Sequence, residues 1–226
     1  MDTGKVWFVM PAFREARVIA STLAQFRETG FNVVVVDDGS DDDTGEIAHR
    51  NGAWVCRHVV NLGAGAALQT GLEFALRNGA DYLVTFDADG QHRLDDAVVM
   101  LSVLRSGGVD VVLGSRFLGT TEGMPPSRRR LLTLATWYTR LQAGLPLTDT
   151  HNGLRAFSAE AARQIELRHN RMAHASELLK QIAVKKLRWQ ESPCTVVYTE
   201  YSRAKGQRNS GMFDILLDLF MGRLHR

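Results

Sequence analysis

Two carboxylates stand two residues apart in the segment Asp87-Ala88-Asp89, and this spacing suits the binding of one hard divalent cation. Mg²⁺ and Mn²⁺ prefer oxygen ligands and share them with the phosphates of a substrate. A cation held there would neutralise a departing diphosphate as a Lewis acid. The segment follows a hydrophobic run at 81–86 and precedes Gly90-Gln91-His92, where His92 is a further candidate ligand. The alternative is a solvated Asp-Gly turn with His92 as an ordinary loop residue.

The acidic pair must be positioned by regular elements, and the first 115 residues alternate between strand and helix patterns. Hydrophobic runs predict strands at 5–10, 32–36, 53–57, 81–86 and 109–113, and apolar spacing predicts helices at 15–29, 43–51, 65–78 and 94–106. This order is typical of βαβ units and predicts an α/β fold with a Rossmann-like, mostly parallel sheet flanked by helices. Ligands of such sheets bind beyond the carboxyl ends of the strands.

Polar clusters follow all five predicted strands, where that rule places a ligand. They are Pro11–Glu15, Asp37–Ser40, Asn61–Gly65, Asp87–Gln91 and Gly114–Arg116. In the second cluster we expect one Asp to accept a hydrogen bond from a ribose hydroxyl or a base N–H, and Ser40 or its neighbours to cap the helix that follows. The glycine-rich third cluster differs from a dinucleotide-binding fingerprint because it follows the third predicted strand rather than the first and has no third glycine. It could form a turn beside a ligand or a purely structural turn.

Basic residues dominate the later part of the chain. The first 99 residues carry 8 Lys/Arg and 15 Asp/Glu, and the remaining 127 carry 19 and 10. This asymmetry suits cation binding by the first part of the chain and anion binding by the later part, although ordinary surface charge is the simpler explanation. Arg128-Arg129-Arg130 follow a predicted loop at 117–127 and begin a predicted helix at 128–143, where they oppose the helix dipole. Arg203 and Lys205 lie in a predicted basic loop at 199–211 that could close over phosphates.

The remaining elements are predicted helices at 158–166, 173–186 and 212–224 and a strand at 193–198. Asp149 and Arg155 lie just before and within a further predicted strand. Asp149 could act as a general base or orient an acceptor, or Arg155 could be its structural partner. The apolar final helix could lie in a membrane interface together with the 128–143 helix, pack in the core or form a dimer seam. No nucleic-acid-binding motif accompanies the basic loop, and we expect no nucleic-acid partner.

The composition indicates one globular domain over residues 1–226. The chain is 45% hydrophobic and 23% charged, which is enough to bury one sizeable core. Cys56 and Cys194 are far apart and form neither a disulfide framework nor a metal-ligand spacing, which favours a reducing compartment. The N-terminus is a poor signal peptide, and no apolar run reaches the roughly 18 residues of a membrane span. We therefore expect a cytoplasmic protein.

Six motifs occur in a fixed order: Pro11-Ala12-Phe13-x-Glu15, Asp37-Asp38-Gly39-Ser40, Asn61-x-Gly63-x-Gly65, Asp87-Ala88-Asp89-Gly90-Gln91-His92, Gly114-Ser115-Arg116 and Asp149-x-x-x-Gly153-x-Arg155. This ordered set resembles the family 2 glycosyltransferases, most closely the dolichyl- and polyprenyl-phosphate sugar synthases. The resemblance covers nearly the whole chain. It implies a GT-A fold with a nucleotide-sugar-binding half at 1–115 and an acceptor-binding half at 116–226. It also implies inverting, metal-dependent transfer of a sugar from a UDP or GDP sugar.

The resemblance further implies roles for individual residues. Those expected to bind the nucleotide sugar are Pro11, Ala12, Glu15, Asp38, Gly65, Asp87, Arg203 and Lys205. Those expected to hold Mg²⁺ or Mn²⁺ are Asp87, Asp89 and Gln91. Those expected near the acceptor are Gln91, Ser127, Arg128, Arg129 and Arg130, and those expected to take part in catalysis are Asp89, Arg116 and Asp149.

Two departures from the family bear on the substrates. Arg14 stands where the family usually has Asn, and the transmembrane segments of the membrane-bound members are missing from the sequence. We expect a polyprenyl phosphate acceptor at the inner face of the membrane, reached by peripheral contact, with a homodimer or a membrane-protein partner as open arrangements. The alternatives are a sugar hydroxyl of a growing glycan and a non-catalytic sugar-nucleotide-binding protein. A nucleotidyltransferase is disfavoured because the first cluster lacks glycines.

The acceptor decides whether the reaction needs a base. A phosphate monoester has a second pKa near 6, so it is already an anion and needs positioning by arginines. A sugar hydroxyl is not ionised at pH 7 and needs a base, for which Asp149 is the candidate. The arginine cluster at 128–130 favours phosphate.

Overall fold

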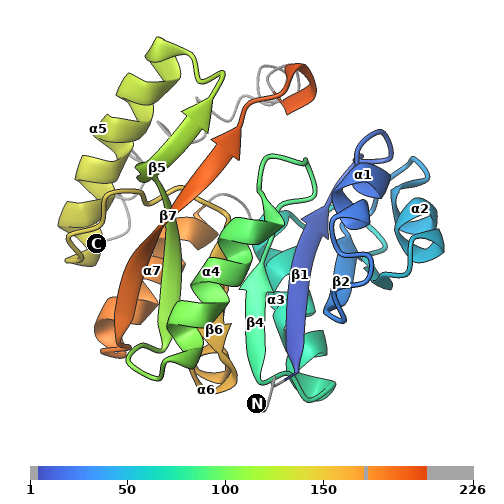
Figure 1. Ribbon diagram of the computed structural model, residues 1–226, viewed down its shortest axis with the longest axis horizontal. Helices are drawn as coiled ribbons and strands as arrows, with labels where there is room; N and C mark the ends of the chain where they lie inside the picture. The colour runs from blue at the N-terminus through green and yellow to red at the C-terminus, as the bar shows by residue number, and fades with distance from the viewer. Residues whose placement is uncertain (1–4, 171–172, 203–226) are drawn as a thin grey trace.

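The computed structural model describes residues 5–170 and 173–202 and contains one seven-stranded sheet in the order β3-β2-β1-β4-β6-β5-β7 (Figure 1). Its strands are β1 Val6–Ala12, β2 Asn32–Asp37, β3 Trp54–Arg57, β4 Tyr82–Thr85, β5 Val111–Glu122, β6 Arg155–Ser158 and β7 Trp189–Val197. Its helices are α1 Ile19–Ala24, α2 Thr44–Arg50, α3 Ala64–Arg77, α4 Leu94–Arg105, α5 Pro126–Ala143, α6 Ala159–Gln164 and α7 His174–Val184.

The sheet is mostly parallel, as the sequence predicts, and β6 is the exception. β1 pairs in parallel with β2 and β4, and β2 with β3, whereas β6 runs antiparallel to both β4 and β5. The four parallel strands β1 to β4 therefore end at the same edge, and the polar clusters that follow them meet there. This architecture confirms the predicted α/β class with a Rossmann-like sheet.

Two apolar layers pack against the two faces of the sheet. Alternate residues of β1 divide between them: Trp7 and Val9 face α3, α6 and α7, and Phe8 and Met10 face α1, α2 and α4. A side-chain period of two produces this division. Helix α3 approaches β1 closely, because a Cβ placed on Gly71 would lie 2.3 Å from a methyl carbon of Val9.

The segment at 117–122 differs from the sequence prediction. A strand at 109–113 followed by a loop was expected, but β5 continues to Glu122 and pairs with β7, which itself begins at Trp189 rather than 193. The glycine that indicates a loop in the sequence instead allows β5 and β7 to lie close together. A Cβ on Gly119 would lie 2.2 Å from the carbonyl oxygen of Cys194, so glycine lets the two backbones approach.

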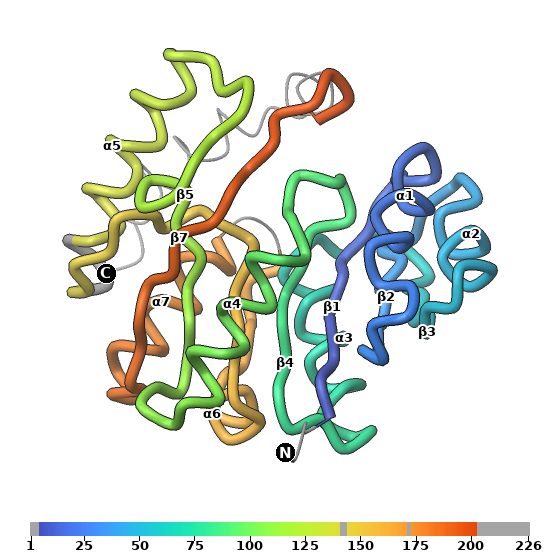
Figure 2. Tube along the Cα trace, viewed as in Figure 1, coloured from blue at the N-terminus to red at the C-terminus, as the bar shows by residue number. Residues whose placement is uncertain are grey.

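Other boundaries shift less. The first helix is shorter than its predicted range, and residues 200–202 begin a helical turn where a loop was expected. The predicted helix at 212–224 lies outside the described residues. Figure 2 shows α1 and α2 at one end of the sheet and α5 at the other. Within the described ranges, no helix has the length and apolar character needed to cross a membrane.

Candidate active site

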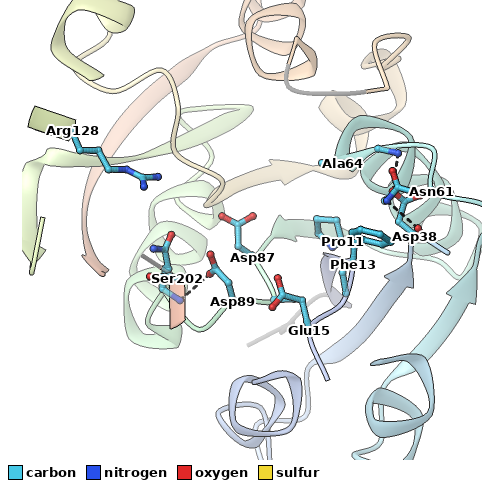
Figure 3. A pocket seen from close by; sticks show the side chains of 15 residues that line it. Pro11, Phe13, Glu15, Asp38, Asn61, Ala64, Asp87, Asp89, Arg128 and Ser202 are labelled. Carbon is cyan, nitrogen blue, oxygen red and sulfur yellow. Dashed lines mark hydrogen bonds between the residues drawn. The ribbon is translucent and has the colours of Figure 1, made fainter. Parts of the chain in front are cut away.

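A cavity of about 450 Å³ opens at the edge of the sheet where β1, β2 and β4 end. Figure 3 shows the carboxylates of Asp87, Asp89 and Glu15 between Arg128, which is directed toward them, and Asp38 on the opposite side. The described residues that line it are Pro11, Ala12, Phe13, Glu15, Asp38, Asn61, Gly63, Ala64, Ala67, Asp87, Ala88, Asp89, Gln91, Arg128 and Ser202.

Asp87 is oriented by contacts with two other segments. His92 Nε2 donates to Asp87 Oδ2 at 3.0 Å, and the buried His92 ring packs edge-on against Phe86. A Cβ on Gly153 would lie 2.2 Å from Asp87 Oδ2 and 2.5 Å from Oδ1, so a glycine is required beside this carboxylate. His92 therefore orients Asp87 through Nε2, while its buried Nδ1 has no hydrogen-bond partner among the described residues.

The two acids of the pair have pKa values shifted in opposite directions. Burial, together with the neighbouring charge of Asp87, raises the pKa of Asp89 to about 7. Burial also acts to raise the pKa of Asp87, but the hydrogen bond from His92 and the charges of His92, Arg155 and His174 outweigh it and lower that pKa. The negative charge of Asp89 thus lacks full compensation from the protein.

The donor set at this end fits Mg²⁺ or Mn²⁺. Asp87, Asp89 and Gln91 offer carboxylate and amide oxygens, and the backbone N–H of Gln91 steadies Asp89 Oδ1 at 3.1 Å. Across residues 5–170 and 173–202, no three His, Cys, Asp or Glu side chains gather into a site that could hold a metal ion by themselves. Substrate oxygens or water would therefore have to complete the coordination of a cation here.

Asp38 closes the opposite end of the cavity. Its Oδ1 accepts from the N–H of Leu62 at 2.9 Å and its Oδ2 from the N–H of Gly63 at 2.7 Å, while His58 Nδ1 donates to Oδ1 at 2.7 Å. These bonds tie the end of β2 to the loop before α3. The adjacent Asp37 accepts from the N–H of Ser40 and supports the turn instead.

Gly65 does not line the cavity, although its neighbours Gly63 and Ala64 do. Its N–H donates to the carbonyl of Asn170 at 2.8 Å, and a Cβ there would lie 2.0 Å from the carbonyl oxygen of His169. The expectation that Gly65 itself meets the donor is therefore not supported. This glycine lets α3 pack closely against the segment that precedes α7.

Glu15 lines the cavity and is held from the end of the described chain, where Tyr201 Oη donates to Glu15 Oε2 at 2.8 Å. Ser202 also lines the cavity, a contact that sequence reasoning missed because the 199–211 segment was noted for its cations. The expected phosphate ligands Arg203 and Lys205 lie outside the described residues.

Arg14 does not line the cavity within the described part of the chain. Its φ of 54° is in the left-handed region, which Asn tolerates better than Arg. Its guanidinium pairs with Asp41 at 2.6 Å on the surface. Arg14 therefore directs its charge to the surface pair with Asp41 rather than into the cavity.

Arg116 and Asp149 form a buried ion pair rather than an exposed acid and base. Arg116 Nε donates to Asp149 Oδ2 at 2.6 Å, Nη1 to Tyr198 Oη at 2.8 Å and Nη2 to the carbonyl of His151 at 2.6 Å. The N–H of His151 donates to Asp149 Oδ1. Neither Arg116 nor Asp149 is among the described lining residues. This geometry does not support the expectation that Asp149 takes a proton from an acceptor.

The three consecutive arginines at the start of α5 have different surroundings. Arg128 is half-buried and lines the cavity, whereas Arg129, Arg130 and the preceding Ser127 are exposed. A cationic side chain thus reaches the cavity from the side opposite Asp38. Arg128 lines the cavity and Arg129 and Arg130 do not, and the expected role of Arg128 at the acceptor stays a prediction.

Comparison with known proteins identifies the family. Residues 7–166 match the model of glycosyl transferase family 2. The chain belongs to glycosyl transferase family 2. This glycosyltransferase takes its sugar from a nucleotide sugar, and the match includes the acidic pair, Asp38 and Arg128.

Two relatives match almost the whole glycosyltransferase. An uncharacterized protein of Methanocaldococcus jannaschii is 39% identical over 99% of this chain and 94% of that protein. The UDP-N-acetylglucosamine–dolichyl-phosphate N-acetylglucosaminyltransferase of Methanococcus voltae is 32% identical over 96% of this chain and 95% of that protein.

A solved structure shares the fold of the glycosyltransferase. The glucosyl-3-phosphoglycerate synthase of Mycobacterium tuberculosis, solved with Mn²⁺ and UDP-glucose, superposes with a TM-score of 0.69 at 20% identity. The superposition covers 98% of this chain and 79% of that one. The predicted GT-A fold is confirmed by this likeness.

Proposed function

We propose that this glycosyltransferase transfers a sugar, with inversion, from a UDP or GDP sugar to a polyprenyl phosphate at the inner face of the membrane. The observation that carries the proposal is the composition of the cavity. An acidic pair and an arginine face the same space, and Asp149, the base expected from the sequence, is buried in an ion pair. Such a site suits an acceptor that already carries its negative charge.

The donor would lie along the edge of the sheet. Asp38 and the loop at 61–63 provide polar groups for a nucleoside, and Pro11 and Phe13 provide apolar surface beside them. The diphosphate would then lie near Asp87 and Asp89. A bound Mg²⁺ or Mn²⁺ would supply charge neutralisation for the leaving group, and Asp87, Asp89 and Gln91 would hold it.

The acceptor phosphate would meet Arg128. A phosphate monoester is largely ionised at pH 7, so an arginine needs only to orient it for in-line attack on the anomeric carbon. A relative of similar length is named for transfer to dolichyl phosphate, which supports an acceptor of this class. Arg129 and Arg130 are exposed on the same helix and would meet anionic head groups in a peripheral contact with the membrane.

The proposal is tested by product formation. The protein would be incubated with Mn²⁺, farnesyl phosphate and in turn UDP-N-acetylglucosamine, UDP-glucose and GDP-mannose, and products identified by mass spectrometry. We expect a glycosyl farnesyl phosphate from one donor and none when farnesol replaces farnesyl phosphate. Arg128→Ala should raise the KM for farnesyl phosphate about 10- to 100-fold, the loss expected for a hydrogen bond to a charged group.

Arg140→Ala serves as the matched control, because it removes an exposed arginine from the same helix. Its acceptor KM should equal that of the wild type. Transfer to a glycan hydroxyl with no reaction at farnesyl phosphate would replace the proposed acceptor. Intact donor in every mixture would indicate a non-catalytic sugar-nucleotide-binding protein.

A further inference from the structure

Arg128 contacts an aromatic ring rather than a carboxylate. Its guanidinium carbon lies 5.1 Å from the ring centroid of Tyr198, within the range of a cation–π interaction. Among the described residues, no Asp or Glu forms an ion pair with Arg128. The ring therefore steadies the guanidinium without neutralising it, and the charge stays available for an anion in the cavity.

Arg128 occupies an unfavourable position for a positive charge. It lies in the first turn of α5, where the helix dipole disfavours a positive charge. The first turn of this helix contains no acidic residue that could compensate. A free arginine side chain samples many rotamers, and binding an anion with it costs the entropy of fixing one of them. Contact with a fixed ring reduces that cost before the anion arrives.

The Tyr198 ring is fixed from several directions. The residue follows β7 and is 3% exposed, and its N–H donates to the carbonyl of Glu122 at 2.8 Å. Its hydroxyl accepts from Arg116 Nη1 at 2.8 Å. Arg116 is held in turn by Asp149, through both its N–H and its Nε. A continuous set of contacts therefore runs from Asp149 through Arg116 and Tyr198 to Arg128.

We infer that Tyr198 is a positioning residue that holds Arg128 toward the phosphate-binding side of the cavity, with the buried pair Arg116–Asp149 anchoring its hydroxyl. The identity of the anion as an acceptor phosphate rests on the proposed function, but the coupling between Tyr198 and Arg128 does not. This assignment gives Asp149 an indirect role, because its charge acts through Arg116 and the Tyr198 ring rather than on a proton of the acceptor.

A double-mutant cycle tests the inference. Wild type, Tyr198→Leu, Arg128→Ala and the double variant would be compared for the KM of farnesyl phosphate. Tyr198→Leu should raise this KM about 3- to 30-fold, the range that a cation–π contact supports, and leave the donor KM unchanged. In the Arg128→Ala background the same change should have no further effect, because the ring then has no cation to hold.

Tyr198→Phe separates the ring from its hydroxyl. It keeps the surface under Arg128 and loses the bond to Arg116, so its KM should rise less than that of Tyr198→Leu. If Tyr198→Leu fails to fold, Tyr198→Met is the second ringless variant, since its flexible side chain fills irregular space. The inference would be overturned if Tyr198→Phe raised the KM for farnesyl phosphate as much as the ringless variant. It would also be overturned if the KM increases of the Tyr198 and Arg128 substitutions multiplied in the double variant.

A second readout separates this inference from the proposed function. Binding of inorganic phosphate would be followed by ³¹P NMR without metal in the same four proteins, with Arg140→Ala as control. If the wild-type protein does not glycosylate farnesyl phosphate, the proposed acceptor is refuted. Non-additive losses of phosphate binding at Tyr198 and Arg128 would still support the positioning role, and additive losses would refute it.

Discussion

At the scale of single residues, the acidic pair depends on neighbours that carry no reactive group. Gly153 leaves the space that the Asp87 carboxylate occupies, and His92 fixes one of its oxygens. Asp89 remains the less compensated acid, with its pKa raised to about 7 by burial and by the charge of Asp87. Two predictions follow from this arrangement, one steric and one electrostatic.

Gly153→Ala should displace the Asp87 carboxylate and weaken the binding of Mn²⁺ by about 10- to 100-fold, the loss typical when a residue supporting a metal ligand is changed. The added methyl group would lie within 2.6 Å of all three carboxyl atoms of Asp87. Mn²⁺ affinity would be measured by electron paramagnetic resonance. Gly108→Ala is the matched control, since a Cβ there meets no atom within 4 Å. Unchanged Mn²⁺ affinity in Gly153→Ala would exclude Asp87 as a ligand.

Asp89→Asn should stabilise the metal-free protein at pH 8. The pKa of Asp89 in the folded protein is about 7, above the ordinary value of 3.8. Protonation of Asp89 therefore adds to the free energy of unfolding at pH 4, and this contribution is lost as the pH rises through 7. Removing the buried charge should raise Tm at pH 8 by about 2–8 °C, with a smaller change at pH 5.5. Differential scanning calorimetry measures both. Mn²⁺ should raise Tm of the wild type at pH 8 but not that of Asp89→Asn.

At the scale of elements, α5 presents different residues to the cavity and to solvent. Arg128 faces inward, while Leu134 and Trp137, 56% and 59% exposed, lie on an outer stripe. The helix carries four arginines and no acidic residue. Exposed Trp and Leu beside arginines are typical of helices that lie in an anionic membrane interface.

Leu134→Gln combined with Trp137→Gln should therefore weaken association with vesicles containing phosphatidylglycerol, because it removes the apolar contact with the interface. Co-sedimentation should show a several-fold smaller bound fraction, with transfer to farnesyl phosphate retained. Val98→Gln combined with Val99→Gln, on the exposed side of α4, is the matched control. If both double variants bind vesicles like the wild type, α5 does not contact the membrane.

At the scale of the whole molecule, the cavity joins distant parts of the chain. Pro11 and Ser202 line the same space, and Tyr201 donates a hydrogen bond to Glu15, which also lines it. A ligand that fills the cavity therefore contacts the beginning, the middle and the end of the described chain. Because such a ligand binds the native state, it should stabilise the entire fold.

UDP, GDP, dTDP and CDP with Mn²⁺ would be compared by thermal shift. The nucleotide that belongs to the donor should raise Tm by about 5–10 °C at a hundredfold excess over its Kd. Asp38→Asn should reduce this shift, because Asp38 lines the nucleoside end of the cavity. A shift of equal size with all four nucleotides would show that the base is not recognised.

The order of elements and the acidic pair were predictable because both depend on local sequence. The run Val33–Val36 reads as a strand buried on both faces, and each of its residues is buried. The extension of β5 to Glu122 was not predictable, because Gly119 looks like a loop residue until Cys194 lies against it. Site residues divide in the same way: Asp38, Asp87 and Asp89 follow strand ends, whereas Ser202 and Tyr198 lie near the cavity through the pairing of β7 with β5.

The sequence alone determined the α/β class, the edge of the sheet where ligands gather, and the family, because hydrophobic period and motif order are properties of the chain itself. The tertiary structure alone decided which charges are free and which are paired. From the sequence alone, Asp149 and Arg128 are equally good candidates for residues that act on the substrates. Only packing shows that the first is satisfied inside the protein by Arg116 and that the second reaches the cavity across the ring of Tyr198.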